Sequence, residues 1–544
     1  GRVTLEAGKT ARLIGVRSGG YFTPKAMRAA SNRKLERETA GADWVAISLD
    51  RFASMLRPLV EHRQKQGLTT MVVTDAEVYE AFGHGNFGAA AIGAFLRHAV
   101  ENWKIKPRYV LLVGDADYDV DWISQKPVMP TTLVPTYYNG ATASDHGFVA
   151  DLPTDVAIGR FPVRAEADLV RMMTKIMRYE SEAPGGAWRR RLSFIASEGR
   201  FGPAIDPLIE KAVVTMLEEA VPAAYDVDMT YANASSRYLY PPKHFNDQVI
   251  RRFNDGALVF SYIGHGFRNG FDSLRVGRDM YPILHDKDTS RLDAGTKTPI
   301  MAIIACSTAQ FDDPGDDAIG ENLVRSGGGP VALIGATRVS HPLPNALLSR
   351  EIVREVFGQA ATLGDALIAA KKRLVTDWRK DSLAELGVMF LGALNADRLV
   401  RDHLDLYVLF GDPAMRIAKP DESMTIACAA SVALAGELVV TGEWKGADGG
   451  KATVTLECER HVILRPTKDV DPKSPDSESI ILANYQAAND KVAARVEAVI
   501  EGGKFKATLI VPVDVPAGRY FAKAFAESGA RVAVASAPVA ITEK

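Results

Sequence analysis

The sequence has 544 residues, of which 47% are hydrophobic, and its 65 basic and 67 acidic side chains give a net charge of −2. A chain of this length can bury several cores, so we expect two to four domains. The balanced charge gives no electrostatic basis for binding nucleic acid or a membrane surface, and no apolar stretch approaches the roughly 20 residues that cross a bilayer.

The first 40 residues are polar and basic and predict an N-terminal arm, 1–40. From 41 to 186, helical patterns alternate with short apolar runs rich in Val, Ile and Leu. This alternation predicts an α/β subdomain with a parallel sheet and helices on both faces. Its predicted elements are helix 57–67, strand 69–73, helix 89–103, strand 109–113, strand 156–159 and helix 165–182.

A Pro-Gly-Gly joint at 183–186 precedes a second round of the same alternation, so 187–420 is predicted to be a second α/β subdomain. Its predicted elements are strand 192–196, helices 205–220 and 243–254, strands 257–263, 299–305 and 331–334, and helix 344–357. From 424 onward, short alternating runs are separated by Gly, Pro and Asp. They predict a third domain, 421–544, with an immunoglobulin-like β-sandwich.

One histidine and one cysteine follow two of the apolar runs of the second subdomain. The run 257–263 ends at Gly264-His265-Gly266, and the run 299–305 ends at Cys306. Side chains just beyond the carboxyl ends of neighbouring parallel strands converge on one crevice. A thiol and an imidazole placed there are the nucleophile and base of a cysteine hydrolase.

A cysteine at the end of a strand is often only a small buried hydrophobe. Here Cys306 opens a polar loop, and the glycines around His265 leave room for a substrate backbone. We therefore favour the catalytic interpretation, with the backbone N–H groups of Gly266 and Cys306 as oxyanion donors.

These motifs resemble the gingipain family of cysteine peptidases, C25, whose members have a caspase-like fold. Further motifs match in the family's order from about residue 50 to 418: Leu111–Asp115, Thr154–Phe161, Val331–Thr337 and Phe410–Pro413. The β-sandwich that follows also matches. The resemblance implies a catalytic domain of two α/β subdomains with parallel-rich sheets, and it places nucleophile and base in the second.

The resemblance also implies two acidic residues from the segment before strand 156–159. Asp145 is the candidate that orients His265, and Asp151 is the candidate that binds a basic P1 side chain. The segment is shorter here, so the two roles could be exchanged or absent, and both side chains could simply be solvated. The loop after strand 331–334 should wall the same crevice, with Arg338 and His341 as candidate substrate contacts. The positive charge of Arg338, and a histidine where the family has an aromatic residue, weaken the expectation of a basic P1 residue.

The loop after Cys306 carries four aspartates: Asp312, Asp313, Asp316 and Asp317. Their oxygens could hold Ca²⁺, although the EF-hand spacing is absent. Capping of the next helix is the simpler interpretation. We expect no required cofactor.

The sequence therefore predicts a cysteine endopeptidase that hydrolyses protein or peptide substrates through a thioester. Two alternatives stay open: a sortase-like transpeptidase of a secretion system, and a catalytically silent scaffold that uses the crevice for binding. The chain begins at Gly1, so we expect that a leader was removed and that the protein is secreted, periplasmic or on the cell surface. Cys428 and Cys458 could pair after export, but two separate thiols are the simpler expectation.

Overall fold

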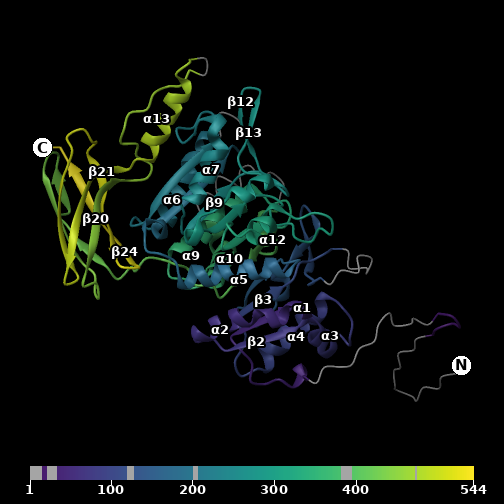
Figure 1. The fold of residues 1–544 in the computed structure, drawn as a ribbon. Helices are drawn as coiled ribbons and strands as arrows, with labels where there is room; N and C mark the ends of the chain where they lie inside the picture. Colours follow the sequence, from purple (N-terminus) through teal and green to yellow (C-terminus); the bar gives the residue numbers. More distant parts are fainter. Residues whose placement is uncertain are drawn as a thin grey trace.

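A ten-stranded sheet forms the centre of the protein (Figure 1). The computed structural model describes residues 15–20, 33–118, 128–199, 206–380, 395–471 and 474–543. The strand order is β2-β1-β3-β6-β16-β15-β14-β9-β7-β8. Much of the predicted arm 1–40 therefore lies outside the described residues.

The first half of the sheet contains four parallel strands, β1 (Trp44–Ser48), β2 (Thr70–Thr74), β3 (Tyr109–Val113) and β6 (Ala157–Phe161). Every residue of β1 and β3 is buried, as expected for strands covered on both faces. Thr74 and Glu77 form a capping box that begins a helix directly after β2. The helices of this half are α1 (Asp50–Ala53), α2 (Arg57–Lys65), α3 (Asp75–Phe82), α4 (Ala89–Asn102) and α5 (Glu166–Ser181).

The second half adds five parallel strands and one antiparallel strand. The parallel ones are β7 (Arg191–Ser197), β8 (Asp226–Ala232), β9 (Val259–Ile263), β14 (Ile300–Ile304) and β15 (Ala332–Ala336), and β16 (Tyr407–Phe410) runs antiparallel to β15. The helices are α6 (Asp206–Ala220), α7 (Phe245–Asn254), α8 (Ile319–Arg325), α9 (Pro342–Phe357), α10 (Leu363–Asp377) and α12 (Ala396–Leu406). Three short hairpins project from the two halves: β4 (Thr132–Thr136) with β5 (Gly140–Ser144), β10 (Gly266–Phe267) with β11 (Gly270–Phe271), and β12 (Ser273–Val276) with β13 (Asp279–Pro282).

The two predicted halves share one sheet, because β16 pairs with β15 on one side and with Arg160 of β6 on the other. A buried ion pair strengthens this joint. Asp412, which follows β16, accepts hydrogen bonds from Arg63 Nε at 2.8 Å and from Trp44 Nε1 at 3.0 Å. Figure 1 accordingly shows the purple first half directly below the teal and green second half.

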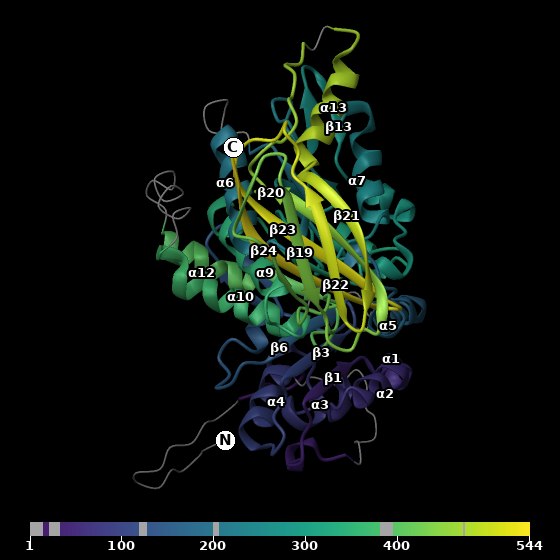
Figure 2. The same cartoon turned by 90° about the vertical axis from the view of Figure 1, so that its left-hand side faces the viewer.

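The C-terminal residues form a separate eight-stranded sheet with its own core. Its strands are β17 (Thr425–Ala427), β18 (Ser431–Ala433), β19 (Glu437–Glu443), β20 (Gly449–Cys458), β21 (Val492–Glu501), β22 (Lys504–Ile510), β23 (Gly518–Ser528) and β24 (Arg531–Thr542). Strands β19 and β22 alternate strictly between buried and exposed residues, so one face packs inward. Figure 2 shows the curled sheet. Strand β17 comes into contact with β24. The immunoglobulin-like topology and the domain boundaries stay predictions.

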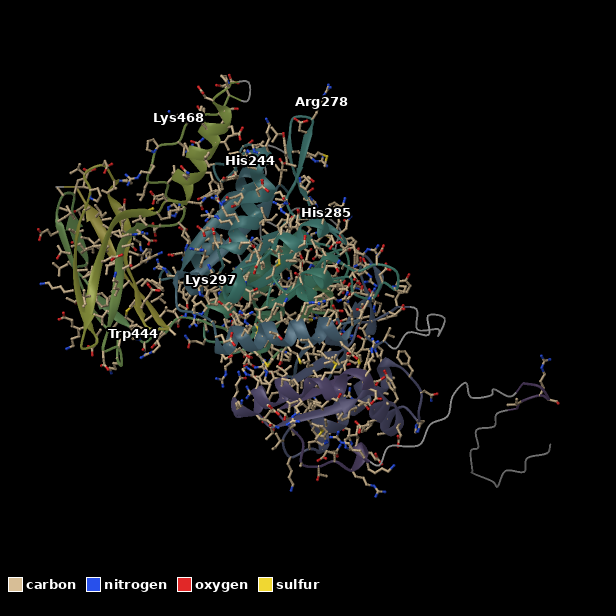
Figure 3. The ribbon with its side chains drawn as sticks, in the orientation of Figure 1. His244, Arg278, His285, Lys297, Trp444 and Lys468 are labelled. Atoms are coloured by element: carbon tan, nitrogen blue, oxygen red, sulfur yellow. The ribbon has the colours of Figure 1, made fainter. Side chains whose placement is uncertain are left out.

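Two features connect this sheet to the rest of the protein. The unpredicted helix α13 (Ser477–Asn489) packs against β8, where Tyr485 Oη lies 2.9 Å from Thr230 Oγ1. Arg460, which follows β20, donates to the carbonyls of Val221 and Pro222 at 2.7 and 2.9 Å. Within the domain, Asp421 accepts a hydrogen bond from Trp444 Nε1 at 2.9 Å, and Figure 3 shows Trp444 toward the lower end of the sheet. A cavity of about 520 Å³ lies between this sheet and the edge formed by β7 and β8, and charged side chains of both parts line it.

All three cysteines are free thiols, so Cys428 and Cys458 remain separate as in the simpler prediction. Among the described residues, no helix is both long and apolar enough to span a membrane.

Candidate active site

The structure places His265 and Cys306 at equivalent positions beyond two adjacent strands. Ile263 of β9 pairs with Ile304 of β14 in a parallel register, and each of the two candidate residues lies two positions farther along its chain. The Gly264 N–H continues the pairing by donating to the Ile304 carbonyl at 3.3 Å. Both side chains are half-buried. The two residues therefore follow the carboxyl ends of adjacent parallel strands, as the sequence predicts.

The two glycines around His265 are required by close contacts. Gly264 has a φ of 156°, and a Cβ on it would collide with the Ser197 hydroxyl. A Cβ on Gly266 would lie 2.6 Å from the Ala305 Cβ and 2.9 Å from the Cys306 carbonyl oxygen. The histidine loop thus lies directly against the segment that carries the cysteine.

Hydrogen bonds fix the backbone of His265 on both sides. Its N–H donates to Ser197 Oγ at 3.2 Å, and its carbonyl accepts from the Tyr262 hydroxyl at 2.6 Å. The ring atom Nε2 is buried and makes no hydrogen bond with any described residue. Buried polar atoms are nearly always paired, so this unpaired ring nitrogen is an unusual feature of the histidine.

The N–H of Gly266, the predicted oxyanion donor, is not used within its own hairpin. Asp272 N–H donates to the His265 carbonyl, which makes the pair Gly266–Phe271 a non-hydrogen-bonded position of the antiparallel hairpin. At such a position the N–H points away from the partner strand. The Gly266 N–H is therefore directed out of the β10–β11 ladder.

The sulfur of Cys306 contacts Ser340, a residue that sequence reasoning missed. The Ser340 N–H donates to Sγ at 3.4 Å, the Ser340 hydroxyl oxygen lies 3.7 Å from Sγ, and the thiol donates to the Ser340 carbonyl at 3.6 Å. Ser307 also donates its N–H to the Arg338 carbonyl at 3.0 Å. The loop after β15 therefore borders the thiol, as the sequence predicts.

Asp145, the candidate orienting residue, is engaged elsewhere. Its two carboxylate oxygens each accept a hydrogen bond from the Arg160 guanidinium at 2.7 Å, and Thr131 donates to it at 2.9 Å. Asp145 is 3% exposed and Arg160 is fully buried. The orienting role stays a prediction, and these contacts give Asp145 a structural role that competes with it.

Asp151 lies exposed in the turn after the β4–β5 hairpin, and its carbonyl accepts from Arg97 at 3.4 Å. Two further carboxylates that the sequence did not single out are close to the hairpin. Asp402 accepts the Tyr137 N–H at 2.7 Å, and Asp405 accepts from the Ser144 hydroxyl at 3.0 Å. Burial raises the pKa of Asp405, the charge of Lys371 and the hydrogen bond from Ser144 lower it, and the charges of Asp402 and Asp151 raise it. Both neighbouring aspartates are therefore close enough to act on Asp405.

The tip of this hairpin touches the loop that borders the thiol. Asn139 donates its side-chain N–H to the Val339 carbonyl at 3.0 Å, and its side-chain oxygen accepts the Val339 N–H at 3.2 Å. Tyr138 stacks on His341 with 6.2 Å between ring centroids. The predicted substrate contact His341 thus faces an aromatic side chain from the first half of the chain, and burial lowers its pKa.

Each of the four aspartates of the acidic loop forms an ion pair with an arginine, and Arg338 is one of these arginines. Arg338 binds both oxygens of Asp312, a fully buried carboxylate. Arg268 pairs with Asp313 and Asp316, and Asp317 pairs with two other arginines. Calcium binding by this loop stays a prediction, since arginine side chains already neutralise these carboxylates.

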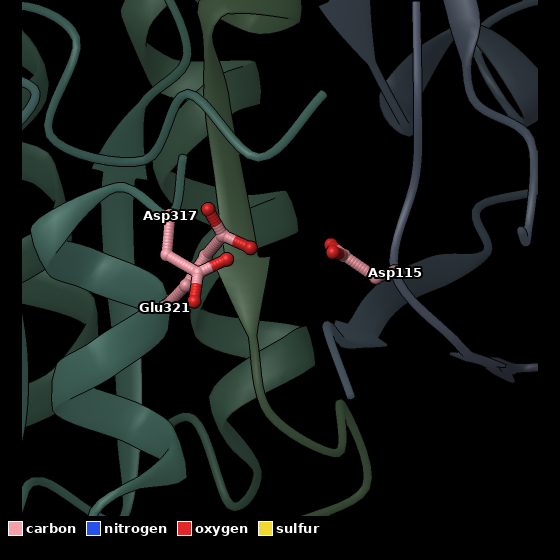
Figure 4. Close-up of side chains that lie close together, drawn as sticks. All are labelled: Asp115, Asp317 and Glu321. Atoms are coloured by element: carbon pink, nitrogen blue, oxygen red, sulfur yellow. The ribbon is translucent and has the colours of Figure 1, made fainter. Parts of the chain in front are cut away.

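A cluster of three acidic residues lies between the two halves (Figure 4). Asp115 follows β3, Asp317 lies two residues before α8, and Glu321 lies in the first turn of that helix. Oxygens of all three come within 4.8 Å of one another. Arg164 and Arg325 pair with this cluster, and one oxygen of Asp115 has no hydrogen-bond partner among the described residues. Three carboxylates thus face two guanidinium groups. Burial, and then the charge of Asp115, raise the pKa of Glu321 well above its ordinary value.

The raised pKa of Glu321 predicts how stability depends on pH. The unfolded chain loses this proton near the ordinary pKa of about 4.5, while the folded chain keeps it to a higher pH, so stability decreases as the pH rises above 4.5. We expect Glu321→Gln to remove this loss and to raise Tm by about 1–3 °C at pH 7.5 but not at pH 4.

Thermal unfolding of both proteins in EDTA checks this prediction, because the chelator removes any divalent cation from the three carboxylates. Glu355→Gln is the control, since Glu355 pairs with Arg373 away from this cluster. A lower Tm for Glu321→Gln at pH 7.5 would show that the charged carboxylate stabilises the fold instead.

Comparisons with known proteins agree with this architecture. The sequence model of peptidase family C25 matches residues 37–418. The structure of the Arg-specific cysteine proteinase gingipain R (RGPB) is similar to this chain with a TM-score of 0.53 and 18% identity, over 94% of this chain and 100% of that one. A complex of Porphyromonas gingivalis RgpB pro- and mature domains gives a TM-score of 0.52 and 17% identity, over 92% and 100% of the two chains. A search of curated protein sequences finds no match.

Proposed function

The chain belongs to peptidase family C25 and is a cysteine-type peptidase with a gingipain-like fold, and we propose that Cys306 and His265 carry out its reaction. The observation that supports this proposal is the register of β9 and β14, which brings the two residues to equivalent positions beyond adjacent strands. In this proposal the imidazole of His265, whose Nε2 has no hydrogen-bond partner among the described residues, takes the thiol proton.

In the proposed reaction the Cys306 thiol gives its proton to His265, and the sulfur attacks the scissile carbonyl carbon. The carbonyl oxygen becomes an oxyanion, which the N–H groups of Gly266 and Cys306 stabilise. The imidazolium then protonates the leaving amine as the C–N bond breaks, leaving a thioester. Water, deprotonated by His265, hydrolyses the thioester and restores the thiol.

The family implies a protein substrate, and we further propose a preference for basic P1 residues. The support is electrostatic, because Asp151, Asp402 and Asp405 gather beside a hairpin whose tip touches the loop at the thiol. A cationic side chain would oppose the repulsion that Asp402 and Asp151 exert on Asp405, as Lys371 already does. Following the resemblance, we propose that the protein acts as a secreted, periplasmic or cell-surface peptidase.

Covalent labelling tests the dyad. Peptidyl acyloxymethyl ketones with Arg or Leu at P1 should add one peptidyl group to Cys306, as measured by mass spectrometry of the digested protein. We expect faster labelling by the Arg probe and no labelling of Cys428 or Cys458. Labelling of another residue would refute the role of Cys306, and equal rates for the two probes would refute the basic P1 preference alone.

A further inference from the structure

Two polar groups of Ser340, the backbone N–H and the side-chain hydroxyl, lie close to the sulfur of Cys306. The N–H donates to Sγ at 3.4 Å, and the hydroxyl oxygen lies 3.7 Å from the same atom. Ser340 is 6% exposed, so water does not readily replace these contacts. When the thiol loses its proton, it can no longer donate to the Ser340 carbonyl, and the sulfur becomes only an acceptor.

The direction of the Ser340 hydroxyl proton depends on Asn345. The Asn345 side-chain N–H donates to Ser340 Oγ at 2.9 Å. Because Oγ accepts this bond, its own proton remains free to point at another acceptor. The sulfur of Cys306 and the Tyr407 hydroxyl oxygen are both within reach of this proton, and a charged sulfur is the stronger acceptor of the two. A thiolate at this position would thus meet both the N–H and the O–H of Ser340.

Asn345 itself is held by one buried side chain. Its Oδ1 accepts from the Tyr407 hydroxyl at 2.7 Å. The nearby His403 Nε2, 3.1 Å from Oδ1, is an acceptor as well and gives Asn345 no hydrogen bond in that orientation. Nδ1 of His403 lies 2.7 Å from the Leu399 carbonyl, and the His341 N–H donates to Nε2 at 3.2 Å. A neutral ring with its proton on Nδ1 satisfies both of these last contacts. Burial favours that neutral form, because it lowers the pKa of His403 to about 3.

We propose that Ser340 is a further catalytic residue, whose N–H and O–H stabilise the Cys306 thiolate, and that Asn345 is the positioning residue that directs the hydroxyl. This inference rests on the proposed function. His265 takes the thiol proton, and the negative charge left on sulfur then gains two hydrogen-bond donors. The resting contact from the thiol to the Ser340 carbonyl breaks in the same step, and no other bond changes.

The rate at which iodoacetamide alkylates Cys306 tests this inference without a substrate. For Ser340→Ala we expect the rate at pH 7 to fall about tenfold and its half-maximal pH to rise, because a charged sulfur loses one hydrogen bond. Ser340→Thr keeps a hydroxyl and should restore most of the rate. Asn345→Asp should resemble Ser340→Ala, because a carboxylate would accept the Ser340 proton and turn it away from sulfur.

Ser349→Ala is the matched control. Ser349 lies one helical turn beyond Asn345 in α9, and its buried hydroxyl has no hydrogen-bond partner among the described residues. Its alkylation rate should equal that of the wild type. If Ser340→Ala folds, as judged by its Tm, and reacts like the wild type, the inference is wrong while the dyad stands. If the wild-type Cys306 reacts no faster than Cys428, the proposed function itself fails.

Discussion

Replacing Cys306 with alanine should lower kcat/KM for a fluorogenic peptide at least about a thousandfold, because the thioester cannot form without the sulfur. The half-buried thiol makes only weak sulfur contacts with Ser340, so its loss should leave Tm within about 1 °C. Activity and Tm measured on the same preparation separate loss of chemistry from loss of fold. Cys428→Ala is the matched control, because this half-buried thiol lies in the C-terminal sheet domain and should be dispensable.

The second residue of the dyad provides a sharper form of the same test. If Cys306 and His265 act as one unit, the double variant should be no less active than Cys306→Ala alone, since effects within such a unit do not add. Peptide cleavage that persists in Cys306→Ala and disappears with His265→Ala would mean that another nucleophile uses this histidine. The dyad assignment would then be wrong.

The strand ends could be predicted from the sequence because they depend on local patterns. The apolar runs before His265 and Cys306 match β9 and β14. All five residues of β14 are buried, and so are the first four of β9. The helix predicted at 344–357 is observed as Pro342–Phe357. Where a run of Val, Ile and Leu ends at a polar residue, the sequence alone locates the edge of a parallel sheet.

The features that could not be predicted from the sequence depend on contacts between segments that are far apart along the chain. Ser340 lies 34 residues from the thiol that it touches, and nothing in its own neighbourhood indicates that contact. The joining of two predicted sheets through β16 likewise depends on a single pair, Phe410 with Arg160. Helix α13 was different, because Ile481, Tyr485 and Ala488 recur at helical spacing and pack inward. That signal was present within a region otherwise typical of β-structure.

Asp145→Ala should destabilise the protein by about 3–5 kcal/mol, because it leaves the guanidinium of Arg160 buried without its charge partner. Arg160 is completely buried, and the carbonyls of Gly114, Met129 and Pro130 accept its remaining hydrogen bonds but supply no negative charge. Urea unfolding measures the loss. Asp151→Ala is the matched control, since that nearby carboxylate is exposed and its removal should leave stability unchanged while reducing the preference for basic P1 residues.

The same variant decides between the two roles of Asp145. If Asp145 only supports Arg160, its replacement should lower the unfolding free energy, and the molecules that remain folded, counted by active-site labelling, should keep their kcat. If Asp145 orients His265, its replacement should instead lower kcat while the unfolding free energy stays close to that of the wild type. Because both carboxylate oxygens already bind Arg160, we expect the first result. A fall in kcat without a loss of stability would return Asp145 to the catalytic site that the family resemblance assigns to it.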